Sequence, residues 1–171
     1  MYVLVTGLPA SGKSTLAGAL AAELRLPLYG KDPIKEALAD VLGAGRPDDV
    51  EWSGRLGGAA AEVLWRLLAD SPAAVVDLWV RPEDRDRVAA RLARLRPLVE
   101  VWCACPAEEV LRRYAARAGR HPVHKDAHRL DALRAYTATA GPLRLGPVLR
   151  ADTSIPVDAT ALAAEIRAAA R

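Results

Sequence analysis

Residues 7–14 read GLPASGKS, and no other segment constrains the possible fold of this chain as strongly. The run before them, residues 3–6, is apolar and rich in β-branched side chains, which predicts a buried parallel strand. In the segment after them Leu16, Leu20 and Leu24 recur at a spacing of four residues, which predicts an amphipathic helix. A glycine-containing turn between a buried strand and a helix is a geometry in which backbone N–H groups point at an anion.

The same segment fills every fixed position of the phosphate-binding pattern G-x-x-x-x-G-K-[ST], known as the P-loop. Its glycines let the backbone wrap closely around phosphate oxygens, Lys13 can reach the β- and γ-phosphates, and the Ser14 hydroxyl can ligate Mg²⁺. The alternative, a glycine-rich turn without a ligand, fits this strand–helix context poorly. We therefore expect ATP and Mg²⁺ as cofactors, with these residues in contact with the nucleotide: Gly7, Ala10, Ser11, Gly12, Lys13, Ser14 and Thr15.

Strands alternate with helices along the whole chain, which predicts an α/β fold with a parallel sheet flanked by helices. At 171 residues the chain favours one domain, spanning residues 1–171. We expect strands at residues 3–6, 28–29, 73–77, 98–104 and 147–151. We expect helices at residues 13–26, 32–42, 52–70, 82–95, 107–116 and 126–139, and a last helix capped by Asp158. The expected buried face of the third helix contains Trp52, Leu56, Ala60, Val63, Leu64, Leu67 and Leu68.

Two aspartates follow predicted strands, Asp32 after the second strand and Asp77 at the end of the third. Functional residues of a parallel sheet gather at the carboxyl ends of its strands, so both are expected on the same rim as the P-loop. There Asp32 can accept the proton of an attacking hydroxyl, and Asp77 can hold Mg²⁺ directly or through water. A plainer interpretation stays open for each, because Asp is also a common helix N-cap and a common loop cap.

A basic segment that contains Gly119 follows the helix expected at 107–116. Arginines on a mobile segment can close over ATP, neutralise charge that develops on the γ-phosphoryl group and exclude water. We therefore expect an Arg-rich lid at about residues 117–126, with Arg117 and Arg120 in catalytic roles and Arg113 and Arg117 in contact with the nucleotide. The alternative is a solvated helix face. The arginines concerned are Arg112, Arg113, Arg117 and Arg120.

Composition excludes several other classes of protein. The chain has no Asn and no Gln, so it lacks the Asn-Lys-x-Asp guanine-binding motif and the glutamine that orients a hydrolytic water in GTPases. A net charge of +3 without a basic block argues against nucleic acid as a partner. The absence of a long apolar span or a leader sequence predicts a cytoplasmic protein without membrane contact. We expect a monomer or a homodimer.

The three histidines, His121, His124 and His128, have a spacing that suggests a metal site. No set of Cys or Asp residues completes a tetrahedral zinc site around them, so zinc is the less favoured interpretation. For His121 and His124 we favour contact with a phosphate or with the acceptor.

At the P-loop, the two aspartates and the basic segment, the chain resembles the small adenylate-kinase-like P-loop kinases. That group includes bacterial AAA-type ATP-binding proteins, zeta-toxin-like kinases, chloramphenicol phosphotransferase and the kinase domain of polynucleotide kinase. The resemblance covers nearly the whole chain in element order and is specific at residues 7–14, 32–35, 76–77 and 113–124. It implies a three-layer fold whose parallel sheet has the strand order 2-3-1-4-5. It also implies that Asp32 is the base for the acceptor hydroxyl, that Lys35 contacts acceptor or phosphate, and that the lid arginines contact adenine and the γ-phosphate.

The function expected from these features is ATP-dependent transfer of the γ-phosphoryl group to a hydroxyl of a small-molecule acceptor. We expect the acceptor between the second and third strands, in contact with Asp32, Lys35, Asp77 and Trp79; residues 43–69 match nothing that can be assigned. Two alternatives stay open. A polynucleotide 5′-hydroxyl kinase needs clustered cations along the nucleic acid, and the sequence shows no such block. An ATP-sensing module has no use for a base beside the γ-phosphate, so Asp32 argues against it.

Overall fold

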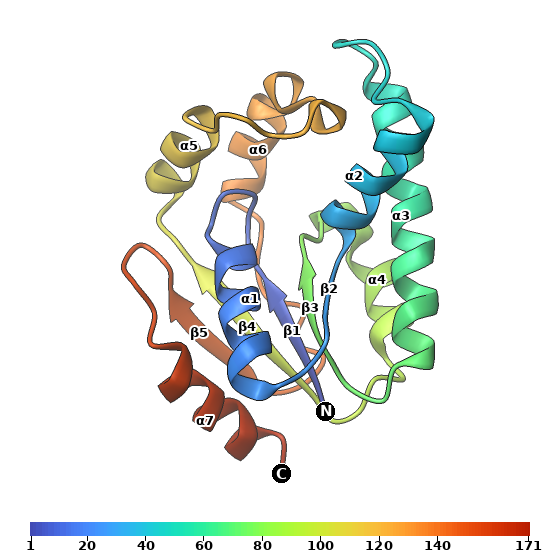
Figure 1. The fold of residues 1–171 in the computed structure, drawn as a ribbon. Helices are drawn as coiled ribbons and strands as arrows, with labels where there is room; N and C mark the ends of the chain where they lie inside the picture. The colour runs from blue at the N-terminus through green and yellow to red at the C-terminus, as the bar shows by residue number, and fades with distance from the viewer.

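The computed structural model describes residues 1–171, and its centre is a sheet of five parallel strands (Figure 1). The strands are β1 (Tyr2–Thr6), β2 (Leu28–Gly30), β3 (Ala74–Leu78), β4 (Leu98–Ala104) and β5 (Val148–Asp152). They lie in the order β2-β3-β1-β4-β5, and every neighbouring pair is parallel. The expected α/β fold and strand order are therefore confirmed, and the carboxyl ends of all strands meet at one edge.

One face of the sheet is covered by α1 (Lys13–Leu24) and α7 (Ala159–Ala169). Leu16 and Leu20 of α1 and Ile166 of α7 pack in one cluster with valines of β1, β3 and β4. The predicted cap of α7 is confirmed, since the Asp158 carboxylate accepts a hydrogen bond from the Ala161 N–H. This packing fixes the amino end of α1, and the P-loop before it, at the carboxyl edge of the sheet.

The opposite face is covered by α3 (Val50–Asp70) and α4 (Arg85–Leu92). Leu64 and Leu68 of α3 and Leu92 of α4 pack against Leu4 of β1 and Val76 of β3. Because successive side chains of a strand point to opposite faces, β1 supplies Val3 and Val5 to one core and Leu4 to the other. The result is the expected arrangement of three layers.

The buried face of α3 is narrower than the sequence predicts. Val63 and Leu67 are 39% and 40% exposed, so their expected place on that face is wrong. The helix meets its neighbours mainly along one row of residues four apart, which leaves the adjacent row in contact with solvent. The buried row contains Leu56, Ala60, Leu64 and Leu68.

The remaining helices lie beyond the carboxyl edge of the sheet: α2 (Lys31–Leu42), α5 (Ala107–Ala115) and α6 (Leu130–Thr137). Between α5 and α6 the chain crosses above the P-loop towards α2 (Figure 1). The continuous helix expected at 126–139 is wrong in its first part, because Asp126–His128 forms only a 3₁₀ turn and Arg129 after it has a φ of −119°. The helix α6 starts after that turn.

None of the helices combines the length and the apolar character that crossing a bilayer requires.

Candidate active site

The P-loop connects the end of β1 to the start of α1 through a tightly curved backbone. Gly12 has a φ of 87°, a left-handed value that glycine adopts without strain. A Cβ on Gly7 would lie 2.6 Å from Ser11 Oγ and 2.9 Å from Cys103 Cβ, so no side chain fits there. These two glycines let the loop fold back over the end of the sheet, with α1 beginning at Lys13.

A pocket of about 330 Å³ lies against this loop. Its lining contains most of the residues predicted for nucleotide contact: Ala10, Gly12, Lys13, Ser14, Thr15, Arg113 and Arg117. Arg120 also lines it, whereas Gly7 and Ser11 do not and lie deeper in the loop. The amino end of α1 opens into the pocket, so backbone N–H donors and the helix dipole both favour a phosphate there.

Two buried polar atoms near the P-loop have no hydrogen-bond partner, Ser11 Oγ and Asp77 Oδ1. Asp77 Oδ1 lies 3.9 Å from Lys13 Nζ, which is an ion pair longer than a hydrogen bond. Buried polar atoms are usually satisfied, so these two fit a site that is completed by phosphate oxygens and hydrated Mg²⁺. Asp77 lies inside β3 and caps no loop, which removes the plainer interpretation of this residue.

The lid arginines contact different parts of the protein. Arg113 donates to Glu109 and to the backbone oxygens of Thr153 and Ser154, so it joins α5 to the segment after β5. Arg112 pairs only with Glu109 and is exposed, which matches the solvated-face alternative for this one residue.

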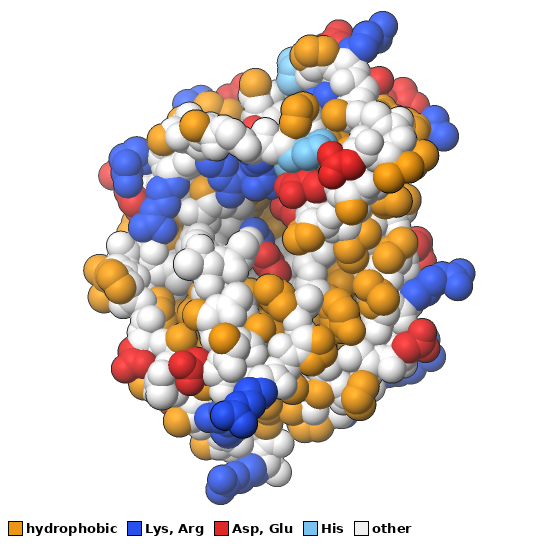
Figure 2. All heavy atoms as spheres, viewed as in Figure 1, with side chains coloured by type: hydrophobic (Ala, Val, Ile, Leu, Met, Phe, Trp, Pro, Cys, Tyr) orange, Lys and Arg blue, Asp and Glu red, His pale blue; other side chains and the backbone are white.

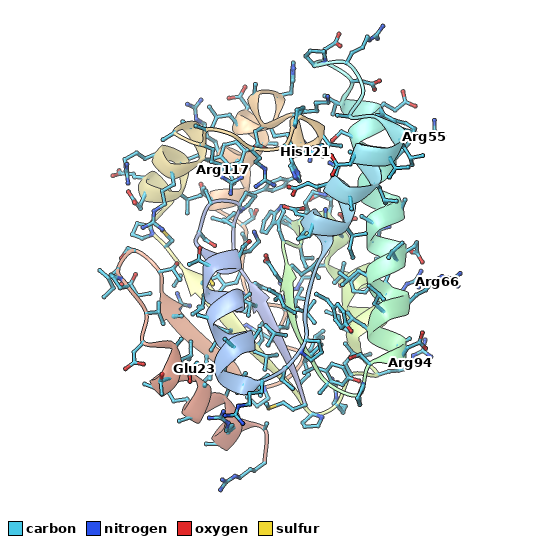
Figure 3. All side chains as sticks on the ribbon, in the orientation of Figure 1. Glu23, Arg55, Arg66, Arg94, Arg117 and His121 are labelled. Atoms are coloured by element: carbon cyan, nitrogen blue, oxygen red, sulfur yellow. The ribbon has the colours of Figure 1, made fainter.

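Arg117, which Figure 3 labels in the crossing segment, lines the phosphate pocket, and Arg120 lines it too. The Arg117 guanidinium stacks 4.9 Å from the centre of the Tyr114 ring and lies 3.4 Å from Asp126 Oδ2. Arg120 Nη2 donates to Asp32 Oδ2 over 2.8 Å. The segment predicted as the lid therefore carries cations over both the phosphate pocket and the candidate base.

Asp32 lies in the first turn of α2, whose N-cap is Gly30 without a side-chain cap. The alternative that Asp32 caps this helix is therefore wrong. Burial disfavours the charged form, but Lys31, Lys13 and other neighbouring cations outweigh it and hold the pKa of Asp32 below its usual range. The carboxylate is thus ionised at neutral pH, and it is a weak base for as long as these cations surround it.

A larger cavity of about 680 Å³ opens beside the phosphate pocket, between β3, α2, α3 and α6. All residues predicted for acceptor contact line it: Asp32, Lys35, Asp77 and Trp79. The space-filling view shows a hollow in this face with basic side chains towards α5 and acidic and histidine side chains towards α2 (Figure 2). Lys13, Arg117 and Arg120 line both the pocket and the cavity, so the two spaces meet at these side chains.

Lys35 and Trp79 line the cavity from opposite sides. Lys35 is 3% exposed, and its ammonium donates to Ser53 Oγ over 2.7 Å. Burial, reinforced by the nearby Arg129, lowers the pKa of Lys35 to about 8. The Trp79 ring meets Tyr136 edge to face, with the ring centres 5.7 Å apart.

The histidines of the crossing segment join it to α2. His121 accepts from the Val123 N–H at Nδ1 and places Nε2 3.1 Å from Asp40, and His124 Nε2 lies 2.6 Å from Glu36. Burial lowers the pKa of His124. The side chains do not converge on one point, and no cluster of potential metal ligands is present. His124 and His128 line the larger cavity instead.

Several cavity residues were missed by the sequence analysis: Lys31, Ser53, Arg129 and Tyr136. They lie on separate elements, and no local pattern marks them. The glycines of α3 gave a usable signal, because Gly54, Gly57 and Gly58 recur at helical spacing and all line the cavity. An ideal Cβ on Gly54 or Gly58 would meet nothing within 4 Å, so these residues leave open space.

A family model described as an AAA domain matches residues 3–140, which is most of the chain. The chain belongs to this AAA-domain family. The matched span contains the P-loop, Asp32, Asp77 and the crossing segment between α5 and α6, so membership covers both the pocket and the cavity.

The proteins that this chain is similar to are described as kinases. A shikimate kinase from Bradyrhizobium diazoefficiens is 30% identical over 123 residues, which are 69% of this chain and 55% of that protein. This AAA-domain chain therefore spans about half the length of that curated relative. A crystal structure from Chloroflexus aurantiacus, described provisionally as a kinase, has a TM-score of 0.80 at 29% identity and covers 99% of this chain and 98% of its own.

A gluconokinase from Sinorhizobium meliloti has a TM-score of 0.58 at 19% identity, over 96% of this chain and 92% of its own, and shows likeness of fold alone. Together with the family match, these findings confirm the resemblance to small adenylate-kinase-like P-loop kinases.

Proposed function

We propose that this protein is an ATP-dependent kinase that transfers the γ-phosphoryl group of ATP to a hydroxyl of a small molecule. One observation carries the proposal. Lys13, Arg117 and Arg120 line both the phosphate pocket and the acceptor cavity, so a phosphoryl group held between them faces both spaces. An in-line transfer needs this adjacency, because the attacking and leaving oxygens lie on opposite sides of the phosphorus.

The P-loop backbone and Lys13 hold the ATP phosphates, while Arg113 and Arg117 flank the nucleotide. Ser14 and Asp77 would hold Mg²⁺, one through a hydroxyl and the other through a carboxylate, which is an oxygen donor set that Mg²⁺ accepts. When bound, the ion neutralises negative charge on the β- and γ-phosphates.

Asp32 takes the proton of the acceptor hydroxyl as the hydroxyl oxygen attacks the γ-phosphorus. The bond between the γ-phosphorus and the bridging oxygen of the β-phosphate breaks, and ADP leaves. The carboxylate is ionised and lines the cavity. Its low pKa is set by the surrounding cations, so its basicity increases when a cation such as Arg120 turns away from it. Its present partner is Arg120. We propose that Arg120 turns to the γ-phosphate when ATP binds, so that Asp32 is freed for the acceptor.

Residues 117–126 act as the lid in this proposal. Val123 is fully buried against Ala39 of α2 and Leu56 of α3, and His121 and His124 pair with acids of α2. The closed segment shields the phosphates from water, which favours transfer over hydrolysis.

The relatives support a small-molecule acceptor. Shikimate kinase and gluconokinase are named for small molecules, and the cavity here is bounded by α2, α3 and α6. A cavity of about 680 Å³ is of the size that small-molecule sites have. No groove for a nucleic-acid backbone is needed to explain the charges around it.

A transfer screen with γ-labelled ATP tests the proposal. Acceptors would include sugars, sugar acids, nucleosides, aminoglycosides and DNA ends, and label is expected in a small-molecule product. Label in DNA ends alone would favour a polynucleotide kinase. ATP binding without transfer to any acceptor would contradict kinase activity and favour an ATP-sensing module.

A further inference from the structure

The acceptor cavity holds more cations than its acids can neutralise. Nine Lys and Arg side chains line it, against five Asp and Glu side chains. All of the acids already have a basic partner within 4 Å: Asp32 with Arg120, Asp77 with Lys13, Asp126 with Arg117 and Arg120, Asp84 with Arg81 and Arg87, and Glu62 with Arg91. Three cations are left without a carboxylate, namely Lys31, Lys35 and Arg129.

Two of the unpaired cations converge on one neutral oxygen. Lys35 Nζ donates to Ser53 Oγ over 2.7 Å, and Arg129 Nη2 donates to the same oxygen over 3.1 Å. The Ser53 hydroxyl donates its own proton to the Val123 backbone oxygen over 2.6 Å. Arg129 Nε is buried and has no partner at all. A single hydroxyl thus takes the place of an anion between an ammonium and a guanidinium.

This arrangement is unfavourable unless something negative joins it. Burial and then the neighbouring Arg129 lower the pKa of Lys35 to about 8, and burial likewise lowers the pKa of Lys31. Buried charges are normally paired or hydrogen-bonded to a partner of opposite sign. Asp32 is the acid that acts on both lysines, but it pairs with Arg120, and no carboxylate lies within 4 Å of Lys35 or Arg129. The missing partner is therefore expected to enter with the ligand.

We propose that the acceptor carries, besides its reacting hydroxyl, an oxyanion group that binds between Lys35 and Arg129. The proposal rests on the proposed kinase function for the identity of the ligand as acceptor, but not for the site itself. A carboxylate or a phosphate monoester both have the required oxygens, and the planar guanidinium of Arg129 can bind either with two parallel hydrogen bonds.

The fold also brings the two residues that would contact the acceptor close together. Asp32 and Lys35 are three residues apart on α2, so their Cβ atoms are about 5–6 Å apart on the same side of the helix. Both side chains line the same cavity, so one acceptor can contact Asp32 through its hydroxyl and Lys35 through its oxyanion group.

Calorimetric titration tests the oxyanion subsite directly. The chain is first saturated with Mg²⁺ and a non-hydrolysable ATP analogue, so that the P-loop cannot bind the probes, and phosphate is kept out of the buffer. The probes are matched compounds: D-gluconate, D-glucitol 6-phosphate and neutral D-glucitol, together with shikimate and its methyl ester. Variants are Lys35→Met and Arg129→Gln, with Arg134→Gln as the control, because Arg134 lies on α6 outside the cavity and pairs with Asp131.

An anionic probe is expected to bind at least about tenfold more tightly than its neutral counterpart, and either variant should lose roughly 10- to 100-fold in affinity for it, as for a lost hydrogen bond to a charged group. Arg134→Gln should bind like the wild type. Preference for carboxylate over phosphate, or the reverse, identifies the group. Lys35→Met removes a buried charge, so its fold should be retained even if Arg129→Gln is unstable.

The inference is overturned if no anionic probe binds, if neutral probes bind equally well, or if the preference survives both substitutions. Transfer of label to a neutral acceptor with unchanged kinetics in Lys35→Met would also overturn it, while leaving the kinase function intact. Oxyanion binding without transfer to any acceptor would support the oxyanion subsite and overturn the proposed kinase function.

Discussion

The phosphate pocket takes five of its eight lining residues from residues 10–15, whereas the acceptor cavity collects side chains from α2, α3, α4, α6 and the segments after β3 and α5. In the pocket, the curved backbone and one helix terminus supply most of the groups that can bind phosphate, and both features follow from a short motif. In the cavity, binding depends on side chains brought together only by the finished fold. The nucleotide end is therefore fixed locally, and the acceptor end is fixed by tertiary packing.

Asp32→Asn should have the largest effect, which is expected on the transfer rate and not on ATP binding. Loss of the base is expected to lower the transfer rate by roughly 10²–10⁴-fold with ATP affinity nearly unchanged, as measured by steady-state kinetics and nucleotide titration. Folding should persist, because Asn can still accept a hydrogen bond from Arg120 and caps no helix here. Asp131→Asn, an exposed acid outside both spaces, is the control. Full transfer by the Asp32 variant would refute the assigned role.

Lys13→Met should weaken ATP binding more than it weakens acceptor binding. Loss of a charge placed at the phosphates is expected to reduce transfer by about 10²–10³-fold and to weaken ATP binding. Acceptor binding, followed by calorimetry without nucleotide, should weaken by a smaller factor, because Lys13 also lines the cavity but other cations remain there. Lys13→Arg should restore only part of the activity, because a planar guanidinium does not replace a compact ammonium in the loop. Wild-type turnover by Lys13→Met would remove the P-loop from the mechanism.

The pH dependence of acceptor binding should separate the two ends further. Lys35 has a pKa of about 8 in the folded chain against an ordinary value of 10.5, so it loses its proton through pH 8. KM for an anionic acceptor should therefore rise above pH 8, by up to about tenfold per pH unit, while KM for ATP follows a different profile. The charged groups around Lys35 are Lys31 and Asp32 on α2, Arg120 in the lid and Arg129 before α6.

The control for this pH effect is Lys35→Met, which should have a flat acceptor KM over the same range. The sign of the stability effect is opposite to that on binding. Between pH 8 and 10.5 the unfolded chain holds the Lys35 proton and the folded chain does not, so this residue's contribution to stability increases with pH. An acceptor KM that is independent of pH in the wild type would contradict the role of the Lys35 charge.

Gly58→Ala should give the smallest effect and act on the cavity wall alone. A helix-interior Gly→Ala change is worth about 0.5–1 kcal/mol of stability, and a Cβ at this position meets nothing within 4 Å. The melting temperature should rise while acceptor KM increases a few-fold, because the new methyl group occupies acceptor space. Gly18→Ala on α1 has the same open surroundings outside both spaces and should raise stability without changing either KM. Equal acceptor KM in both variants would show that the acceptor does not reach α3.

Sequence reasoning predicted the fold, and it named most of the residues that line the pocket at the P-loop, because both depend on local patterns. The P-loop residues are contiguous, and the alternation of strands and helices leaves few ways to order a parallel sheet. It did not find the Lys35, Ser53 and Arg129 cluster, whose members are separated by 18 and 76 residues along the chain. Only the packing of α2 on α3 and the return of the chain through Lys125 bring these three side chains together.

Single residues explain the remaining errors. Val63 and Leu67 have the spacing of a buried helix face, but α3 meets the rest of the molecule along a neighbouring row. The helix expected from residue 126 begins only at Leu130, because Asp126–His128 forms a 3₁₀ turn and Arg129 has a φ of −119°, and the composition of this segment does not indicate either feature. The ion pair between Arg120 and Asp32 joins residues 88 positions apart, and no rule of spacing predicts it.

Gly54, Gly57 and Gly58 form a stretch of α3 where the cavity wall has no side chains. The row of leucines and alanine that anchors the helix lies elsewhere on its surface, so these three positions can change without loosening the sheet or the P-loop. Under the proposed function, single codon changes at these positions would alter the choice of acceptor in a lineage of related enzymes and leave ATP binding unchanged. The same three positions form a compact library for redirecting the enzyme in the laboratory.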